Sequence, residues 1–210
     1  MDPVELFRGI DVYLFDQLLK GRIQPGMRIL DVGCGGGRNL RYFMHEGYRV
    51  SGLDSRPEAI AGVRELEASI ASQATRKVDL AEPPRFRVEA AESSSFEAES
   101  QDVVICNAVL HFARDEEHFQ AMLAGAWRAL KVGGIFFARL ASSIGIESLV
   151  RPLGQRRFDL PDGSQRFLVD EAMLLQAAES MGAELLDPIK TTNVQNLRCM
   201  TTWVLRRTSP

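Results

Sequence analysis

Four glycines within five positions give this sequence its clearest chemical signal: Gly33, Gly35, Gly36 and Gly37. A turn without Cβ atoms lets backbone approach a flat ligand closely and adopts dihedral angles that other residues avoid. The turn follows an apolar stretch, residues 28–32 (RILDV), which predicts a buried strand, and Asp54 comes about twenty residues after Gly33. In open α/β sheets, an acid at that spacing binds a ribose beyond the carboxyl ends of the strands. The spacing therefore predicts a site for an adenosine ribose.

A dinucleotide site fits the same residues less well. The G-x-G-x-x-G fingerprint requires a third small residue, and Arg38 occupies that position. The sequence also has no recognisable Tyr-x-x-x-Lys pair. A nicotinamide-dependent oxidoreductase is therefore the less favoured reading of the glycine turn.

The pattern resembles the class I S-adenosylmethionine-dependent methyltransferases. Their first motif, a strand followed by an acid and x-G-x-G, is matched by Leu30, Asp31, Val32, Gly33, Cys34 and Gly35. Asp54 matches the acid of their second motif. Within the superfamily, the Gly-Arg-Asn sequence at residues 37–39 and the ending RCMTTWVLRR most resemble the tellurite-resistance type. The resemblance implies S-adenosylmethionine as cofactor and S-adenosylhomocysteine as its product.

The resemblance also implies which residues bind the cofactor. Carried over position by position, they are Asp31, Gly33, Cys34, Gly35, Asn39, Asp54, Ser55, Ala91, Glu92 and Asn107. Asp54 is expected to bind both ribose hydroxyls. Glu92 is expected to bind the adenine amino group, with the nearby Glu89 as the alternative.

Composition limits the class of protein. The 210 residues are 45% hydrophobic and 25% charged, as expected for one globular domain spanning 1–210. A net charge of -3 argues against a large nucleic-acid interface. No apolar run reaches the ~18 residues of a membrane span, and no signal peptide is evident. The three separated cysteines indicate reduced thiols, and we expect a cytoplasmic protein without a metal site.

Strand and helix signals alternate along the chain. The predicted strands are residues 28–32, 49–53, 86–90, 102–106, 135–140, 183–189 and 198–205, the last two joined by a turn near 193–196. Predicted helices begin near Arg38 or Asn39, at Pro57 and at residue 115, and residues 72–84 are expected to form a loop. The order predicts a three-layer α/β sandwich with a mainly parallel, Rossmann-like seven-stranded sheet and a C-terminal antiparallel hairpin.

Two segments outside this alternation are expected to face the substrate. Residues 1–24 predict a helical leader that begins near Asp2 and places Tyr13 over the ligands. Residues 141–169 have no clear periodicity and resemble the insert with which the family varies its substrate pocket. Arg151 and Arg157 lie in it, and guanidinium groups suit carboxylate, phosphate or oxyanion recognition. A solvated basic loop is the alternative for this segment.

Methyl transfer from a sulfonium depends largely on positioning, so the sequence need not contain a catalytic triad. His111 is a candidate general base for an acceptor that loses a proton. Residues 107–110 (NAVL) lack the Asn/Asp-Pro-Pro-Tyr/Phe motif of nucleic-acid amino methyltransferases, and Cys106 lacks the preceding proline of cytosine-C5 enzymes. We therefore expect a small-molecule acceptor, for which an anion is one option. A non-catalytic protein that binds the cofactor is the alternative.

Overall fold

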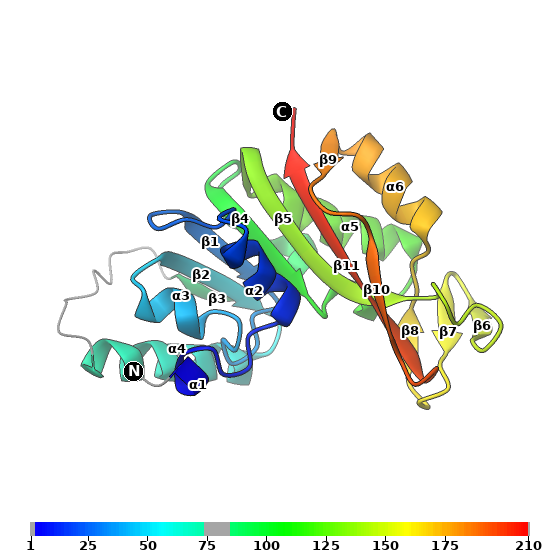
Figure 1. Cartoon of the computed structure of the whole chain (residues 1–210), viewed down its shortest axis with the longest axis horizontal. Helices are drawn as coiled ribbons and strands as arrows, with labels where there is room; N and C mark the ends of the chain where they lie inside the picture. The colour runs from blue at the N-terminus through cyan, green and yellow to red at the C-terminus, as the bar shows by residue number, and fades with distance from the viewer. Residues whose placement is uncertain (1–2, 74–84, 210) are drawn as a thin grey trace.

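A computed structural model describes residues 3–73 and 85–209 of the chain (Figure 1). In these residues the main sheet has eight strands. Seven of them follow one another in the order β10 (Lys190–Val194), β11 (Arg198–Arg207), β5 (Leu130–Ser142), β4 (Gln101–Asn107), β1 (Arg28–Val32), β2 (Arg49–Asp54) and β3 (Phe86–Val88). The eighth strand, β9 (Ala183–Leu185), pairs with β11.

The sheet is parallel where the sequence predicted βαβ units and antiparallel at its C-terminal end. Strands β3, β2, β1, β4 and β5 pair in parallel, and β11 pairs antiparallel with β5, β10 and β9. The predicted fold class is confirmed. One strand prediction was wrong, because residues 183–189 do not form a single strand: β9 ends at Leu185 and β10 begins at Lys190. The turn near residues 193–196 is formed by Gln195 and Asn196, both with positive φ.

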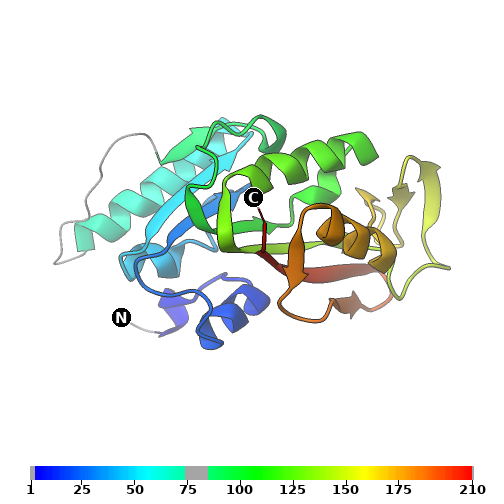
Figure 2. The same cartoon turned by 90° about the horizontal axis from the view of Figure 1, so that it is seen from above.

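Alternation along the central strands builds a hydrophobic core on each face of the sheet. In β1, Leu30 and Val32 belong to one cluster of buried residues and Ile29 to the other. The first cluster is covered by α5 (Glu116–Arg128) and α6 (Glu171–Ser180). The second is covered by α2 (Val12–Leu19), α3 (Arg41–His45) and α4 (Pro57–Gln73). Figure 2 shows α2 and α5 on opposite sides of the sheet, as the three-layer prediction requires.

The leader is two helices rather than one. Helix α1 (Pro3–Leu6) ends before Gly9, which has φ +81°, and α2 begins after Asp11, whose carboxylate accepts a hydrogen bond from the Tyr13 N–H. The predicted start at Asp2 lies outside the described residues. Helix α3 begins at Arg41, later than predicted, because Gly37 at φ +82° continues the turn. Residues 72 and 73 belong to α4, and the rest of the predicted loop, 74–84, lies outside the described residues.

Residues 141–169, which have no clear periodicity in the sequence, contain a second small sheet. It is antiparallel and consists of β6 (Arg151–Gly154), β7 (Arg157–Asp159) and β8 (Gln165–Phe167). Gln155 and Arg156 connect β6 and β7 with φ values of 51° and 58°. Such two-residue turns are normally signalled by Asn-Gly or Asp-Gly. A Gln-Arg turn carries no such signal, which is why the sequence did not predict this hairpin.

The described residues bear on two predictions made from composition, the state of the cysteines and the absence of a membrane span. Within them, Cys34, Cys106 and Cys199 are buried free thiols, as expected. No helix in residues 3–73 or 85–209 is long and apolar enough to cross a bilayer.

Candidate functional site

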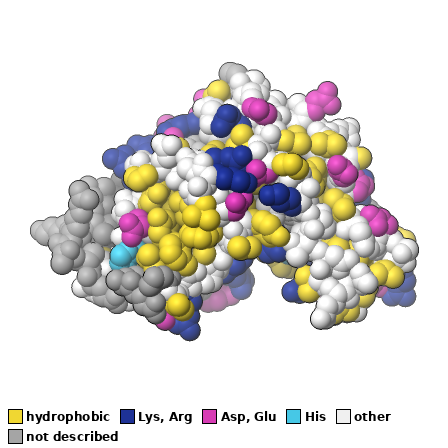
Figure 3. Space-filling model, in the orientation of Figure 1, with side chains coloured by type: hydrophobic (Ala, Val, Ile, Leu, Met, Phe, Trp, Pro, Cys, Tyr) yellow, Lys and Arg dark blue, Asp and Glu magenta, His cyan; other side chains and the backbone are white. Residues whose placement is uncertain are grey.

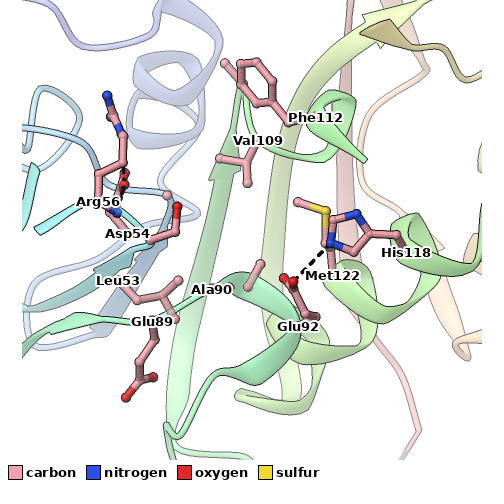
Figure 4. Close-up of a pocket in the computed structure, with 14 residues that line it drawn as sticks. Leu53, Asp54, Arg56, Glu89, Ala90, Glu92, Val109, Phe112, His118 and Met122 are labelled. Carbon is pink, nitrogen blue, oxygen red and sulfur yellow. Dashed lines mark hydrogen bonds and ion pairs between the residues drawn. The ribbon is translucent and has the colours of Figure 1, made fainter. Parts of the chain in front are cut away.

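A cavity of about 600 Å³ opens at the carboxyl ends of the parallel strands (Figure 4). Its walls come from the turns after β1, β2, β3 and β4 and from the first half of α5. The lining residues are Gly33, Leu53, Asp54, Ser55, Arg56, Glu89, Ala90, Ala91, Glu92, Ala108, Val109, Phe112, His118 and Met122. This is the edge at which open α/β sheets bind their ligands, and the volume is typical of a small-molecule site.

Gly33 is the cavity residue for which a side chain is most clearly excluded. It has φ +74°, and an added Cβ would lie 2.3 Å from a methyl carbon of Val109. Gly35 also has positive φ, yet a Cβ there would meet nothing within 4 Å. The two glycines therefore have different reasons for their identity. Gly33 allows a close approach between two chain segments at the cavity, whereas Gly35 satisfies a backbone conformation.

Asp54 binds the glycine turn as well as facing the cavity. Its Oδ2 accepts a hydrogen bond from the Gly35 N–H at 3.0 Å, and its Oδ1 accepts one from the Arg56 N–H at 3.0 Å. The side chain of Asp54 is 8% exposed, and the Arg56 Nε lies 3.3 Å from Oδ1. The Arg56 Nε also donates a hydrogen bond to Oδ1, so it is Oδ2 that keeps a second lone pair for a ligand hydroxyl. The two backbone contacts thus orient the carboxylate that the sequence assigned to the ribose.

Glu92 and His118 form an ion pair on the opposite wall, shown by the dashed line in Figure 4. Glu92 lies in η1 (Ala91–Ser93), and its Oε1 is 3.1 Å from the His118 Nε2. Hydrogen bonds from the backbone and from His118 outweigh the effect of burial and hold the pKa of Glu92 below its ordinary value. The carboxylate of Glu89 instead accepts hydrogen bonds from Ser95. Of the two acids, Glu92 rather than Glu89 therefore has its carboxylate facing the cavity.

Two buried polar side chains behind the cavity have atoms without hydrogen-bond partners. Both carboxylate oxygens of Asp31 and the Nδ2 of Asn107 are buried and unpartnered among the described residues. Asp31 is in β1 and Asn107 ends β4, at the same edge of the sheet as the cavity. Burial raises the pKa of Asp31 to about 7. Such orphaned groups cost free energy unless a ligand satisfies them. Their chemistry, an acid and an amide, fits the ammonium and carboxylate ends of an amino-acid moiety.

Comparison with known proteins identifies the family. A model described as a methyltransferase domain matches residues 30–138, just over half of the chain. The chain belongs to the class I S-adenosylmethionine-dependent methyltransferases. This confirms the predicted family and, with it, S-adenosylmethionine as the cofactor.

Two curated relatives match the methyltransferase domain over part of their length. An uncharacterised methyltransferase of Synechocystis sp. is 36% identical over 114 residues, covering 54% of this chain and 47% of that protein. A ubiquinone biosynthesis O-methyltransferase of Hahella chejuensis is 34% identical over 119 residues, covering 55% of this chain and 44% of that protein. The match with this chain thus spans less than half the length of either relative.

Solved structures share the fold. A methyltransferase structure from Methanosarcina mazei has a TM-score of 0.70 at 20% identity, covering 92% of this chain and 98% of that one. The 1,6-didemethyltoxoflavin-N1-methyltransferase of Burkholderia thailandensis, solved with its substrate and S-adenosylhomocysteine, has a TM-score of 0.65 at 19% identity. It covers 99% of this chain and 80% of that one.

Not every cofactor residue predicted for the methyltransferase domain lines the cavity. Gly33, Asp54, Ser55, Ala91 and Glu92 do, whereas Asp31, Cys34, Gly35, Asn39 and Asn107 do not. Cys34 is buried in the core beneath the turn. Asn39 is buried, and its Oδ1 accepts a hydrogen bond from the Asp11 N–H at 3.1 Å. In this structure Asn39 therefore holds the leader against the glycine turn.

The leader is also bound to the edge of the main sheet. The carboxylate of Asp11 forms an ion pair of 3.0 Å with Arg139, a residue of β5. The Tyr13 hydroxyl hydrogen-bonds to the Thr192 hydroxyl at 2.8 Å, and the Arg139 guanidinium lies over the Tyr13 ring. Tyr13 consequently does not line the cavity, and its role with a substrate stays a prediction.

His111, the predicted base, is buried beside the cavity in η2 (Leu110–Phe112). Its Nδ1 accepts a hydrogen bond from the Ala141 N–H at 3.2 Å. Burial, with the nearby guanidinium groups of Arg166 and Arg198, lowers the pKa of His111 to about 4. A neutral imidazole that accepts at Nδ1 carries its proton on Nε2. In this geometry Nε2 is a donor, so action as a base would require the hydrogen bond to Ala141 to break.

The two predicted substrate arginines already have partners. Arg151 forms an ion pair with Asp159, and 78% of its side chain is exposed. Arg157 donates a hydrogen bond to the Ala113 carbonyl at 3.3 Å. Neither lines the cavity, and a role for them with the substrate stays a prediction.

Sequence reasoning missed several lining residues. His118 lies 26 positions from its partner Glu92 and looks like any polar residue in the first turn of a helix. Phe112 is 57% exposed despite its size, and Ala108 adopts φ +62°, a strained conformation for alanine. For Ala108 and Phe112 the signal was their position just after the buried strand β4, whereas nothing in the sequence marks His118.

Proposed function

We propose that the chain is an S-adenosylmethionine-dependent methyltransferase that acts on a small-molecule acceptor. The observation that supports this most is the convergence of Gly33, Asp54 and Glu92 on one cavity at the carboxyl ends of β1, β2 and β3. Asp54 would bind the ribose hydroxyls, and Glu92 the adenine amino group. Asp31 and Asn107, which have buried atoms without partners, would bind the methionine end.

The cofactor supplies a methyl group already activated on a sulfonium. The residues of the chain then have to bind and orient the acceptor and to exclude water. Effective molarities of about 10⁵–10⁸ M are available from positioning alone. Val109 and Phe112 provide an apolar wall between the side of Asp54 and the side of His118 and Met122, as Figure 4 shows. An acceptor held between this wall and the cofactor would meet the methyl group in a largely water-free space.

Two observations support a small acceptor. The cavity is bounded by strand ends and α5, and its volume of about 600 Å³ is in the range of small-molecule sites. One relative is named for ubiquinone biosynthesis and one structural neighbour for a toxoflavin precursor. Both names describe small molecules.

Calorimetric titration with S-adenosylmethionine and with NAD tests the cofactor site. We expect saturable binding of S-adenosylmethionine and none of NAD, and loss of most of the affinity in Asp54→Ala. Arg206→Gln, at an exposed residue that pairs with Ile135 of β5, is a control and should bind like the wild type. Binding of NAD alone would contradict the proposal.

A second assay separates an enzyme from a protein that only binds the cofactor. Transfer of labelled methyl to a metabolite panel should depend on the protein and be lost in Asp54→Ala. Tight cofactor binding without transfer to any member of a broad panel would favour the non-catalytic alternative.

A further inference from the structure

The three-stranded insert is packed firmly against the cavity wall. Phe167 of β8 is buried, and its ring stacks on Phe119 of α5 with centroids 5.0 Å apart. The Ser143 N–H donates to the Val169 carbonyl at 2.9 Å, and Ser142 and Val169 form a parallel bridge with the main sheet. Figure 3 shows the surface hollowed between the main body and the lobe that the insert forms. The insert therefore presents its side chains from a fixed platform.

The arginines of this region differ in how they are paired. Arg151 pairs with Asp159, Arg156 with Asp170, and Arg198 with Asp162. Arg157 donates to a backbone carbonyl. Among the described residues, Arg166 forms no ion pair, and its one hydrogen bond goes to the Gln165 carbonyl at 2.7 Å. Its guanidinium therefore keeps most of its donors available for a ligand, while its charge helps to lower the pKa of Asp162.

Arg166 lies directly over a residue of the cavity. Its guanidinium carbon is 5.0 Å from the centroid of the Phe112 ring, and Phe112 lines the cavity with more than half of its surface exposed. A guanidinium over an exposed aromatic ring offers a flat apolar surface next to a positive charge. That combination matches a planar molecule with a carboxylate.

His111 adds a neutral donor to the same corner. Its ring is 4.6 Å from the Phe112 ring, centroid to centroid, and Nδ1 is used by the Ala141 N–H. The Nε2–H has no partner among the described residues. A donor that carries no charge complements the fixed charge of Arg166, because the two together can satisfy both oxygens of a carboxylate.

We propose that the methyl acceptor is a small aromatic carboxylate, whose ring packs on Phe112 and whose carboxylate is bound by Arg166 and the Nε2–H of His111. This inference rests on the proposed function, since it names the substrate class of that site. It assigns acceptor specificity to Arg166, rather than to the arginines of the insert that already have partners.

Benzoate and benzamide are suitable probes, because they share a shape and differ in charge. Their binding is measured on the protein saturated with S-adenosylhomocysteine, by calorimetry or ligand-observed NMR. Benzoate should bind at least about tenfold more tightly than benzamide, as expected for a charge-assisted contact. Arg166→Gln should remove that difference, and Arg166→Lys should restore part of it. Arg206→Gln, far from the cavity, should behave like the wild type.

Measuring the binding of S-adenosylhomocysteine shows whether a negative result concerns the acceptor proposal alone or the proposed function as a whole. If S-adenosylhomocysteine binds both the wild type and Arg166→Gln equally, the cofactor half of the proposed function stands. The acceptor proposal is then overturned if benzoate fails to bind, if benzamide binds as tightly, or if Arg166→Gln leaves the preference unchanged. If S-adenosylhomocysteine does not bind the wild type, the proposed function itself is wrong.

Discussion

The two sides of the cavity are built differently. On the cofactor side, Asp54 is fixed by two backbone N–H groups, and Glu92 by His118. On the proposed acceptor side, Phe112 is exposed, Ala108 has positive φ, and Arg166 of a separate sheet lies over the Phe112 ring. The first side is formed by strand ends and the short turns that follow them. The second depends on contacts between segments far apart in the chain. Substitutions on the first side should therefore affect cofactor affinity, and those on the second should affect only the acceptor.

The largest effect is expected at the glycine turn. Gly33→Ala adds a Cβ 2.3 Å from a methyl carbon of Val109, whereas Gly35→Ala adds one in open space. Both changes carry the strain of positive φ, about 1–2 kcal/mol in stability, so the pair is matched for backbone cost. Gly33→Ala should lower S-adenosylmethionine affinity on the order of a hundredfold, a loss of nearly 3 kcal/mol, and Gly35→Ala by clearly less. Equal affinities in the two variants would remove the distinction between these glycines.

Asp54→Ala is expected to act on both stability and binding. It removes the acceptor of the Gly35 and Arg56 N–H groups, which costs about 1–3 kcal/mol in unfolding free energy. It also removes the proposed ribose contacts and should weaken S-adenosylmethionine binding roughly ten- to a hundredfold. Calorimetry and thermal unfolding of Asp54→Ala and Asp54→Asn measure the two effects. A variant that melts earlier but binds normally would show that Asp54 only supports the turn.

The strand-end side is also where the sequence was most informative. Gly33 and Asp54 were found because parallel strands place their carboxyl ends at one edge, so spacing along the chain becomes proximity in space. Asn39 was found for its motif, yet it holds Asp11 instead of lining the cavity. His118 was not found, and Arg166 could not be told apart from the other arginines of residues 141–169, since the importance of both comes from what lies beside them. Neither an ion pair across 26 residues nor the absence of one at Arg166 is visible in the order of residues.

A pH experiment examines the acceptor side without any ligand. The pKa of His111 is about 4 in the folded protein against an ordinary 6.5, so between these values only the unfolded chain takes up the proton. Stability from this group is thus complete above about pH 6.5 and lost as the pH falls toward 4, a change of about 3 kcal/mol. The difference in unfolding free energy between wild type and His111→Gln should shrink over this window. A constant difference would mean that the imidazole is not held neutral.

Taking the difference between wild type and His111→Gln at each pH matters because titration of Asp31 changes the unfolding free energy in the opposite direction. Its pKa of about 7 lies above the ordinary value, so the folded protein retains a proton that the unfolded chain releases. Stability from Asp31 therefore falls as the pH rises toward 7. Asp31 is present in both proteins, and its contribution cancels in the difference.

The smallest effect is expected at Phe112. Because the side chain is 57% exposed, Phe112→Ala should change the unfolding free energy by less than about 0.5 kcal/mol. S-adenosylhomocysteine affinity should stay at the wild-type value, and benzoate affinity should fall about three- to tenfold through loss of the apolar surface. A large loss of cofactor affinity would show that the two sides of the cavity are not separable.

The bridge between Ser142 and Val169 brings the two ends of the insert together at the edge of the main sheet. The intervening residues, 143–168, thus leave the core and return to it at nearly the same point, and no strand of the main sheet depends on their length. If the proposed acceptor site is right, one of its residues, Arg166, lies in this segment, whereas Phe112 and His111 lie outside it. Changes within residues 143–168 would then alter the acceptor side without touching the register of β4, β5 and β11, provided that the packing of Phe167 on Phe119 is kept.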